Sequence, residues 1–331
     1  MVQVDESRLK PNGEFRFARG WFIVASASDI TPDRSHRLFF FDRKMVAFRN
    51  PDGSVAVLDA VCPHMGAELG VNGLIDEGGV RCPYHHWRYG PDGKCNDIPY
   101  CKVIPPQARV HSYPVREVNG LIFVWHDPEL GEPDFEIPEI KEFGDPQWVP
   151  WDLERRDIHS VPLELLDNIA DYGHFEPVHF SKPMTFENQF KGHQAVQIQT
   201  ATHDTLASKE TGVMTSVTTY HGPGFLLTHQ DALYDSYLML SNTPIDDENM
   251  AIWYGMMVKS NGPITPEFMQ MRNDYVDAGR IATSQDVDIW ENKTFVERPM
   301  LCRNDGKILQ AREWYRQFLR PRQPAQLAAA E

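Results

Sequence analysis

The sequence predicts an α+β protein in two parts, a mostly β amino-terminal part and a carboxy-terminal part with an antiparallel sheet and a long helix. The chain of 331 residues is long enough for two domains. Hairpin turns recur in about the first 130 residues, and a stretch rich in proline and acidic residues follows at 127–150. Alternating apolar segments between His193 and Val258 then precede a helical pattern.

Short apolar runs between turn sequences predict the strands of the first part. The turns are Asn50-Pro51-Asp52-Gly53, Gly90-Pro91-Asp92-Gly93 and Asn119-Gly120. The apolar runs beside them are Arg37–Phe48, Ser54–Ala60, Val80–Tyr89, Val110–Val118 and Leu121–His126. Residues 1–130 are therefore expected to form an amino-terminal segment and one small β domain.

Residues 131–331 are expected to form the second domain. Its sheet is predicted from alternating segments that include Val213–Tyr220 and Ala251–Val258. Thr265-Pro266 has the pattern of an N-cap with proline at the first helical position. The helix that it starts is expected to reach about Phe295 and to loosen near Gly279.

Charge and cysteine content exclude some classes of protein. The formal net charge of −15 argues against a nucleic-acid partner, which needs a clustered positive surface. No apolar run approaches the length of a membrane span. Five cysteines are an odd number in a long chain, which favours thiolate ligands in a reducing compartment over disulfides. We therefore expect a cytoplasmic protein.

The first group of candidate ligands consists of Cys62 and His64, followed by Cys82 and His85. Each pair lies in a turn after a predicted strand and offers one thiolate and one imidazole. A structural zinc site is the alternative, but such sites usually draw on pairs of cysteines. One Cys and one His from each loop suit a Rieske [2Fe–2S] cluster, in which both cysteines bind one iron and both histidines bind the other.

The second group lies in Asn168–His179 and contains Asp171, His174 and His179. Asp171 and His174 are three apart and are expected to share a helix face, and Pro177 should end or kink that helix. Ordinary structural histidines are the alternative. Two histidines with a carboxylate are the ligand set of non-haem Fe(II) oxygenases. The remaining carboxylate would come from further along the chain, where Asp286, Asp288 and Glu291 are candidates.

The cluster loops resemble those of Rieske proteins. Respiratory Rieske proteins have an extra cysteine after the ligands of each loop, where this chain has Ala67 and Tyr84. This difference indicates the oxygenase branch of the family. The pattern of Asn168, Asp171, His174 and His179 resembles the iron motif of Rieske oxygenases, which implies a helix-grip (START-like) catalytic domain and a mononuclear Fe(II).

The same resemblance implies roles for single residues. His174, His179 and Asp286 would bind the iron, and Asp286 is preferred to Asp288 because it matches the family's carboxy-terminal motif. Asp171 would bridge His174 to the partner subunit's His85 in a homotrimer. Asn168 would be a further residue of the pocket or of the ligands' surroundings.

Further segments resemble the oxygenase component of 3-ketosteroid 9α-hydroxylase and the related cholesterol 7-desaturases. They are Lys94–Tyr100, Asn119–Pro128, Gln285–Lys293 and Glu313–Phe318. The resemblance implies a monooxygenase that takes O2, an apolar steroid-like substrate and electrons from a flavin or iron–sulfur reductase, directly or through a ferredoxin. The alternatives are a desaturase or demethylase, an oxygenase for another polycyclic or aromatic substrate, an electron carrier and a zinc-stabilised binding module.

Overall fold

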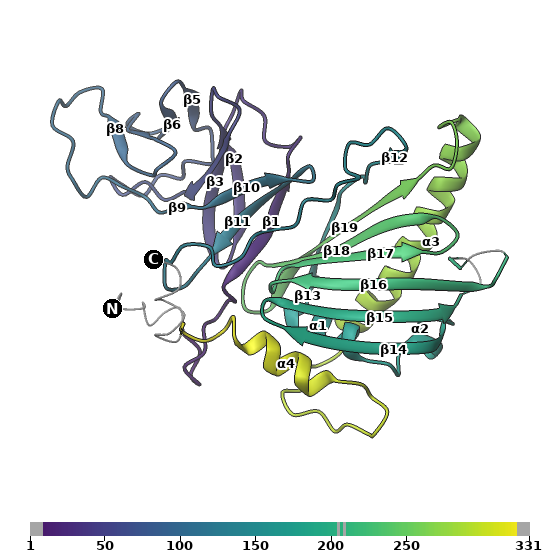
Figure 1. The fold of residues 1–331 in the computed structure, drawn as a ribbon. Helices are drawn as coiled ribbons and strands as arrows, with labels where there is room; N and C mark the ends of the chain where they lie inside the picture. The colour runs from purple at the N-terminus through teal and green to yellow at the C-terminus, as the bar shows by residue number, and fades with distance from the viewer. Residues whose placement is uncertain (1–8, 204–205, 208–209, 323–331) are drawn as a thin grey trace. The chain divides into compact units, whose positions relative to one another are not determined.

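The computed structural model describes residues 9–203, 206–207 and 210–322 (Figure 1), and the chain divides into two compact units. One unit is Trp21–Pro133. The other combines the segment that ends at Gly20 with the residues from Asp134 onward. The sequence analysis placed that first segment with the β part. It groups with the second unit because the N–H groups of Phe15 and Arg19 donate to the carbonyls of Leu319 and Phe318, at 2.7 and 2.8 Å.

The first unit is built from three small sheets. Their strand orders are β1-β11-β10, β2-β3-β4-β9 and β5-β6-β7-β8. The strands are β1 Gly20–Ser26, β2 His36–Phe40, β3 Arg43–Arg49, β4 Val55–Asp59, β5 Leu74–Asp76, β6 Gly79–Arg81, β7 Arg88–Tyr89, β8 Cys95–Asp97, β9 Ser112–Tyr113, β10 Val115–Val118 and β11 Leu121–His126. A mostly β unit is thus confirmed.

One hairpin turn of this unit was predicted from the sequence, and another was not. Asn119 and Gly120 both have positive φ, 55° and 73°, and join paired strands as the sequence predicted. The single run expected over Arg37–Phe48 is wrong, because a turn at Phe41 and Asp42 divides it. Both residues have positive φ, 56° and 57°, which these side chains rarely adopt.

The second unit contains an eight-stranded antiparallel sheet, in the order β12-β19-β18-β17-β16-β15-β14 with β13 also paired to β19. The strands are β12 Trp148–Val149, β13 Glu154–His159, β14 Lys182–Lys191, β15 Gln194–Thr202, β16 Val213–His221, β17 Phe225–Asp231, β18 Asp235–Pro244 and β19 Asn249–Lys259. The predicted sheet from His193 is confirmed, and it extends by three strands that the sequence analysis did not foresee.

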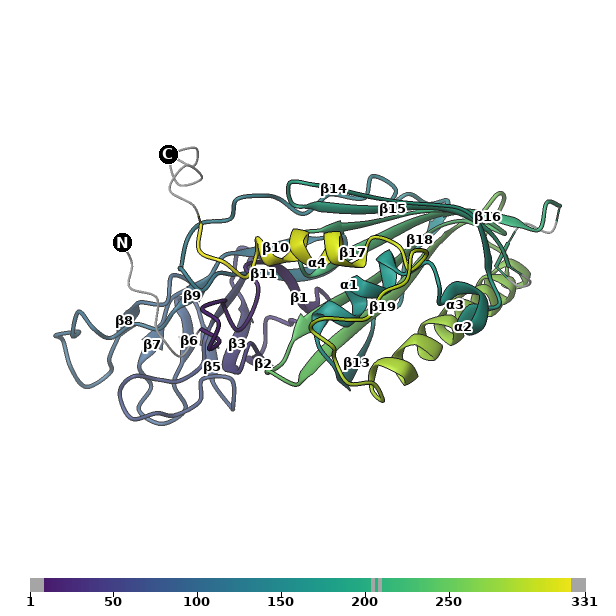
Figure 2. The same ribbon diagram turned by 90° about the horizontal axis from the view of Figure 1, so that it is seen from below.

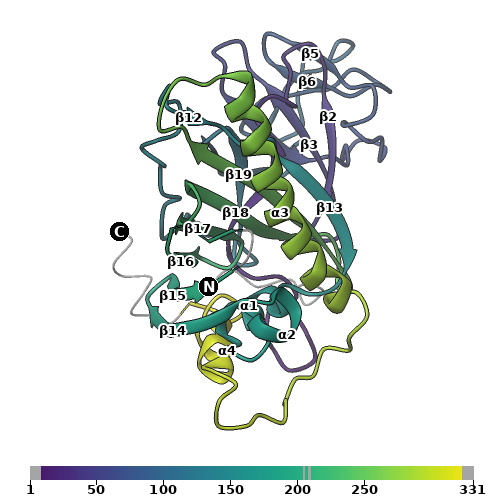
Figure 3. The ribbon, with the colours of Figure 1, turned by 90° about the vertical axis from the view of Figure 1, so that its right-hand side faces the viewer.

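Four helices accompany this sheet: α1 Pro162–Ala170, α2 Phe175–His179, α3 Pro266–Trp290 and α4 Ile308–Arg316. Figures 2 and 3 show α3 crossing one face of the sheet, with α1 and α2 on the same side. This is the helix-grip arrangement that the resemblance implied. In the described part of the chain, no helix is both long and apolar enough to cross a membrane.

The long helix α3 begins as predicted but is not loosened at Gly279. The Thr265 hydroxyl accepts the N–H of Phe268 at 3.2 Å and caps the helix. At Gly279 a Cβ would lie 2.7 Å from Met256 Cε and 2.8 Å from Tyr254 Oη. Glycine therefore serves the close approach of α3 to β19, and the helix continues unbroken to Trp290.

Buried ion pairs fix helix α1, which leads into the candidate site. Arg312 on α4 donates to Asp167 on α1, with Nε 2.8 Å from Oδ1, and both side chains are nearly buried. The same guanidinium donates to the carbonyl of Val296 at 2.7 Å. Glu164, also on α1 and buried, pairs with Lys293 at 2.5 Å. One face of α1 is thus held to α4 and to the segment after α3.

We expect Asp167→Ala to lower the free energy of unfolding by roughly 3–5 kcal/mol, because it leaves the Arg312 charge buried without its partner. The control is Asp157→Ala, which removes the exposed partner of Arg155 and should cost at most about 1 kcal/mol. Urea denaturation followed by tryptophan fluorescence measures both. Similar small losses for the two variants would show that the Asp167 pair does not stabilise the unit.

Candidate functional site

Two loops of the first unit, beginning at Cys62 and Cys82, fold in the same way. In each loop the cysteine N–H donates to the carbonyl five residues later, and the cysteine carbonyl accepts the N–H four residues later, at 2.9–3.0 Å. That fourth residue has positive φ in both loops: Gly66 at 79° and His86 at 59°. Equivalent turns therefore present one cysteine and one histidine each.

The cysteine and histidine side chains of these loops come together, with the Cys62 sulfur 3.2 Å from the Tyr89 hydroxyl. Cys62 and Cys82 are 1% exposed. Burial, followed by the neighbouring Cys62 thiol, raises the pKa of Cys82 although the N–H groups of Tyr84 and His85 act against it. The His64 and His85 rings lie 4.5 Å apart, and the Nδ1 atom of each is buried without a hydrogen-bond partner.

An unpartnered buried imidazole nitrogen is costly unless a ligand satisfies it. The two Nδ1 atoms and the two thiols fit the four ligands of a Rieske cluster. Among the described residues, His174, His179 and Asp286 are the one set of three or more donors whose ligand atoms all lie within 4.8 Å of one another. The donors of the two loops are more widely spread, which disfavours a single zinc ion.

The second candidate site begins where α1 ends, and here the predicted local structure is wrong. Asp171 and His174 do not share a helix, because Asp171 has extended backbone angles and ends α1. The Asp171 carboxylate accepts the N–H of Gly173 at 2.7 Å and so competes with further helical bonding. A second helix starts after His174, and Pro177 lies in its first turn, where a missing N–H costs little.

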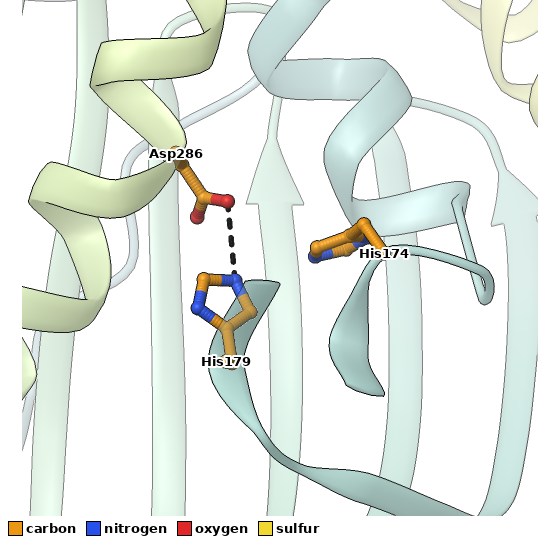
Figure 4. A group of neighbouring side chains, drawn as sticks. All are labelled: His174, His179 and Asp286. Carbon is orange, nitrogen blue, oxygen red and sulfur yellow. Dashed lines mark ion pairs between the residues drawn. The ribbon is translucent and has the colours of Figure 1, made fainter. Parts of the chain in front are cut away.

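The three predicted iron ligands converge (Figure 4). His174 is the N-cap residue of α2, His179 is the last residue of α2, and Asp286 comes from α3. The Nε2 atom of His179 lies 3.1 Å from Oδ1 of Asp286, and the two imidazole rings are 5.2 Å apart at 83°. All three side chains are 10–12% exposed.

The electrostatics of this group fit a cation. Burial alone lowers the pKa of His179, but the hydrogen bond and charge of Asp286 outweigh it and raise the pKa overall. A metal ion would take the place of the proton between them. Gln285 Oε1 lies 3.2 Å from Nδ1 of His179 and holds the ring's other nitrogen. This role of Gln285 was not predicted from the sequence, although Gln285 begins a segment that resembles the family.

His174 has a different environment from His179. Both of its ring nitrogens are buried and lack a hydrogen-bond partner. Its Nδ1 lies 3.5 Å from Oδ2 of Asp171, close enough for attraction but without the geometry of a hydrogen bond. The Asp171 carboxylate is one-third exposed. Nε2 of His174 is thus available to a metal, while Asp171 faces its other nitrogen.

The remaining candidates lie at the edges of the site. The Asp288 side chain is 73% exposed, and Glu291 pairs with Arg156 at 2.8 Å, so neither faces the two histidines as Asp286 does. Asn168 lines a cavity together with His174 and Asp286. Asn168 therefore lies near the group, but within the described part of the chain its side chain makes no hydrogen bond to a proposed ligand.

A cavity lies between the sheet and the helices, and it measures about 910 Å³ including its mouth. His174, His179 and Asp286 line it together with apolar side chains such as Leu165 and Phe175. The sheet side carries several amides and hydroxyls that the sequence analysis missed. They are Gln197, Gln199, Ser216, Thr218, Thr228 and Gln230. Their alternation along three strands can be seen in the sequence. The sequence does not show which face of each strand lines the cavity.

Both units match known protein families. Residues 20–114 match the Rieske [2Fe-2S] domain, and residues 124–319 match the 3-ketosteroid 9α-hydroxylase C-terminal domain. Together with the paired loops and the helix-grip unit, these matches define a Rieske-type oxygenase. The chain belongs to the family of 3-ketosteroid 9α-hydroxylase oxygenase components.

Curated relatives agree with this placement. A probable 3-ketosteroid-9-alpha-monooxygenase oxygenase component of Rhodococcus rhodochrous is 36% identical, over 92% of this chain and 80% of that protein. The Mycobacterium tuberculosis 3-ketosteroid-9-alpha-monooxygenase oxygenase component is 33% identical, over 92% of this chain and 82% of its own length. A cholesterol 7-desaturase of Ciona intestinalis is 28% identical, over 93% of this chain and 70% of that protein.

Solved structures share the fold at low identity. Dicamba monooxygenase bound to dicamba matches with a TM-score of 0.73 and 20% identity, over 96% of this chain and all of that one. The Pseudomonas putida protein NdmA with caffeine matches with a TM-score of 0.72 and 16% identity, over 91% of this chain and 94% of that one. The α+β fold is therefore common to proteins with different bound molecules.

We expect Asp286→Ala to remove about one iron per chain while the visible spectrum of the cluster stays intact, because the change deletes one donor of three. Asp288→Ala is the matched control on the same helix and should retain all iron. Iron and acid-labile sulfide analysis of both purified variants measures this. Full iron content in Asp286→Ala would show that the carboxylate ligand is another residue.

Proposed function

We propose that this protein is the oxygenase component of a Rieske monooxygenase that hydroxylates a steroid-like substrate. The observation that carries the proposal is the convergence of His174, His179 and Asp286 on a cavity, in a chain with Rieske loops. The identity of 36% over 92% of the chain to a probable 3-ketosteroid-9-alpha-monooxygenase component supports the steroid class.

The proposed ligand roles follow from the donor atoms. Cys62 and Cys82 would hold one iron of the cluster, and Nδ1 of His64 and of His85 would hold the other. His174, His179 and Asp286 would hold a mononuclear Fe(II). The cluster would supply single electrons, and the iron would supply the oxygen chemistry that converts a substrate C–H to C–OH.

The overall reaction balances when a reductase supplies electrons in addition to the substrate and O2. Two electrons from a reductase and two protons are consumed with O2, and one oxygen atom enters the product while the other leaves as water. A flavin or iron–sulfur reductase, acting directly or through a ferredoxin, is therefore part of the proposal. The chain's own contribution is to orient its ligands, through Gln285 and Asp171, and to bind the substrate in the cavity.

A cytoplasmic location also belongs to the proposal. Cys62, Cys82, Cys95, Cys101 and Cys302 are all free thiols in the structure. Free thiols persist in reducing compartments, where a reductase partner would also be found.

The decisive experiment supplies a 3-ketosteroid, O2 and an artificial or natural reductase to the iron-loaded protein. We expect O2 uptake that depends on the steroid and a product one oxygen atom heavier, identified by mass spectrometry and NMR. A product that has lost hydrogen would identify a desaturase, as the cholesterol 7-desaturase relative suggests. Turnover of an unrelated small arene but of no steroid would refute the steroid assignment.

The proposal includes a homotrimer in which Asp171 joins two subunits. The Asp171 carboxylate lies near His174 and is one-third exposed, so an oxygen remains available to an outside donor. A cluster-bound His85 would use its buried Nδ1 for iron and keep its second ring nitrogen free. A head-to-tail contact repeated around a closed ring brings every cluster to the next subunit's iron.

Asp171→Asn tests this bridge, and sedimentation of the wild-type protein tests the trimer. We expect iron content and cluster reduction to persist in the variant while single-turnover product falls by at least roughly tenfold, because electron transfer loses its route. Asp157→Asn, at an exposed position, serves as the control and should leave product unchanged. A fully active monomer, or a variant whose one defect is missing iron, contradicts the bridging role.

A further inference from the structure

The sheet side of the cavity shows an inverted pattern of polarity. On β15, Gln197 and Gln199 face inward and are only 3–4% exposed, whereas the apolar side chains between and before them are less buried. On β16, Ser216 and Thr218 are buried while Val217 between them is 38% exposed. Folding alone favours the opposite arrangement, with the apolar face inside. Violations of this rule are expected at functional sites.

Strand register gathers the polar side chains into one compact group, which we name the polar band. Gln199 pairs with Ser216, which pairs with Gln230, and these three residues form one row across β15, β16 and β17. The neighbouring row, two residues along each strand, consists of Gln197, Thr218 and Thr228. Rows so placed are about 7 Å apart, and adjacent strands are about 4.8 Å apart. The polar band is therefore an extended patch on the sheet side of the cavity.

The polar band is only partly satisfied by its own hydrogen bonds. Gln197 Nε2 donates to Gln199 Oε1 at 2.9 Å, and the Thr218 and Thr228 hydroxyls are 3.0 Å apart. The Ser236 hydroxyl lies 3.4 Å from Gln230 Oε1. Each amide has two donors and an acceptor with two lone pairs. Within the described residues, no protein acceptor is recorded for the amide nitrogen of Gln199 or of Gln230, and both side chains line the cavity.

The rest of the cavity wall is of a different kind. The helix side presents the three proposed iron ligands and apolar side chains such as Leu165, Ile169 and Phe175, with Asn168 and Thr283 as further polar groups. Apolar side chains of the sheet border the polar band: Met214, Leu226, Leu238, Leu240 and Met256. Among the described residues that line the cavity there is neither lysine nor arginine. His203 also lines the cavity, but its Nδ1 accepts the N–H of Leu206 at 3.2 Å, as a neutral imidazole does. A substrate carboxylate would therefore bury its charge without a cationic side chain beside it, which is costly. The cavity suits a neutral ligand with one polar and one apolar face.

We propose that the preferred substrate is a neutral polycyclic molecule with hydroxyl groups spread over one face of its ring system. This rests on the proposed function and narrows its substrate class. Hydroxyl groups both donate and accept, as the polar band requires, whereas a ketone accepts at one end of the molecule. The hydroxyl-bearing face lies on the polar band, and the C–H that is oxidised lies on the opposite face, toward His174, His179 and Asp286.

The test compares two ligands by equilibrium dialysis against the iron-loaded protein without reductant. One is a 3-ketosteroid without hydroxyl groups, and the other is the same steroid with two hydroxyl groups on one ring face. We expect the wild-type protein to bind the dihydroxy steroid at least roughly tenfold more tightly. A steroid face without hydroxyl groups would leave the buried amides of the polar band without hydrogen-bond partners. Gln199→Met keeps the side-chain length and should abolish most of this preference.

Matched variants complete the test. Gln189→Met, on the exposed side of neighbouring β14, should keep the full preference. Thr228→Val repeats the test on the second row with a smaller change of shape. Retention of the mononuclear iron, whose proposed ligands lie in the same unit as the substituted residues, reports folding of each variant. Equal binding of the two steroids by wild type overturns the proposal, as does a preference that survives both Gln199→Met and Thr228→Val.

Turnover separates this inference from the function on which it rests. Hydroxylation of the plain ketosteroid without preference for the dihydroxy form refutes only the role of the polar band. Failure to bind or hydroxylate either steroid refutes the proposed function itself. In the product of the dihydroxy steroid, NMR should place the new hydroxyl group on the opposite ring face, and placement on the same face would contradict the proposed orientation.

Discussion

The catalytic unit depends on the buried ion pair between Asp167 and Arg312. Arg312 also donates to the carbonyls of Val296 and Glu297, so one guanidinium joins α1, α4 and the segment after α3. A buried pair of this kind contributes little net stability compared with apolar packing, but it penalises every arrangement that separates its members. It therefore fixes where α1 lies and, through α1, where Asp171 and His174 emerge from the helix.

The chain turns sharply at the end of α1, and this turn brings the candidate iron ligands together. Gly306 has a φ of +85°, and a Cβ there would lie 2.0 Å from the carbonyl oxygen of Ala170, the last residue of α1. Backbone thus contacts backbone at the point where the helix stops. The Asp171 side chain then accepts the N–H of Gly173, and the chain turns so that His174 and His179 can both face Asp286. The turn does what a continuous helix could not, because residues five apart on a helix point in different directions.

The candidate iron ligands predicted from the sequence lie close together in the structure, whereas the local structure predicted around them was partly wrong. The spacing of Cys62, His64, Cys82 and His85 allowed the cluster type to be predicted, because ligand chemistry restricts which residues can recur in paired loops. Asp286 was preferred to Asp288 by resemblance to the family's carboxy-terminal motif, and the structure leaves the Asp288 side chain 73% exposed and that of Asp286 10% exposed. The helix through Asp171 was predicted wrongly, since a spacing of three fits a turn as well as a helix. Asp followed two residues later by Gly was the missed signal.

Alternation along a strand tells which residues share a face, but the tertiary structure decides which face lies inside. Val196 and Ile198 form the more apolar face of β15, and a sequence rule would bury them. The structure buries Gln197 and Gln199 more completely because the space within is a lined cavity and not a packed core. The binding surface was therefore the part of the site that sequence reasoning could least recover.

Helices and strands contribute different parts of the proposed site. The proposed metal donors lie on α3 and around α2, where their spacing must stay constant for one ion to bind. The polar band lies on β15, β16 and β17, whose inward side chains can change without moving the strands, since register depends on backbone pairing. Structures solved with dicamba and with caffeine share this fold at 20% and 16% identity. A protein built in this way can alter substrate preference on the sheet while the helix layer keeps the ligand geometry that the chemistry needs.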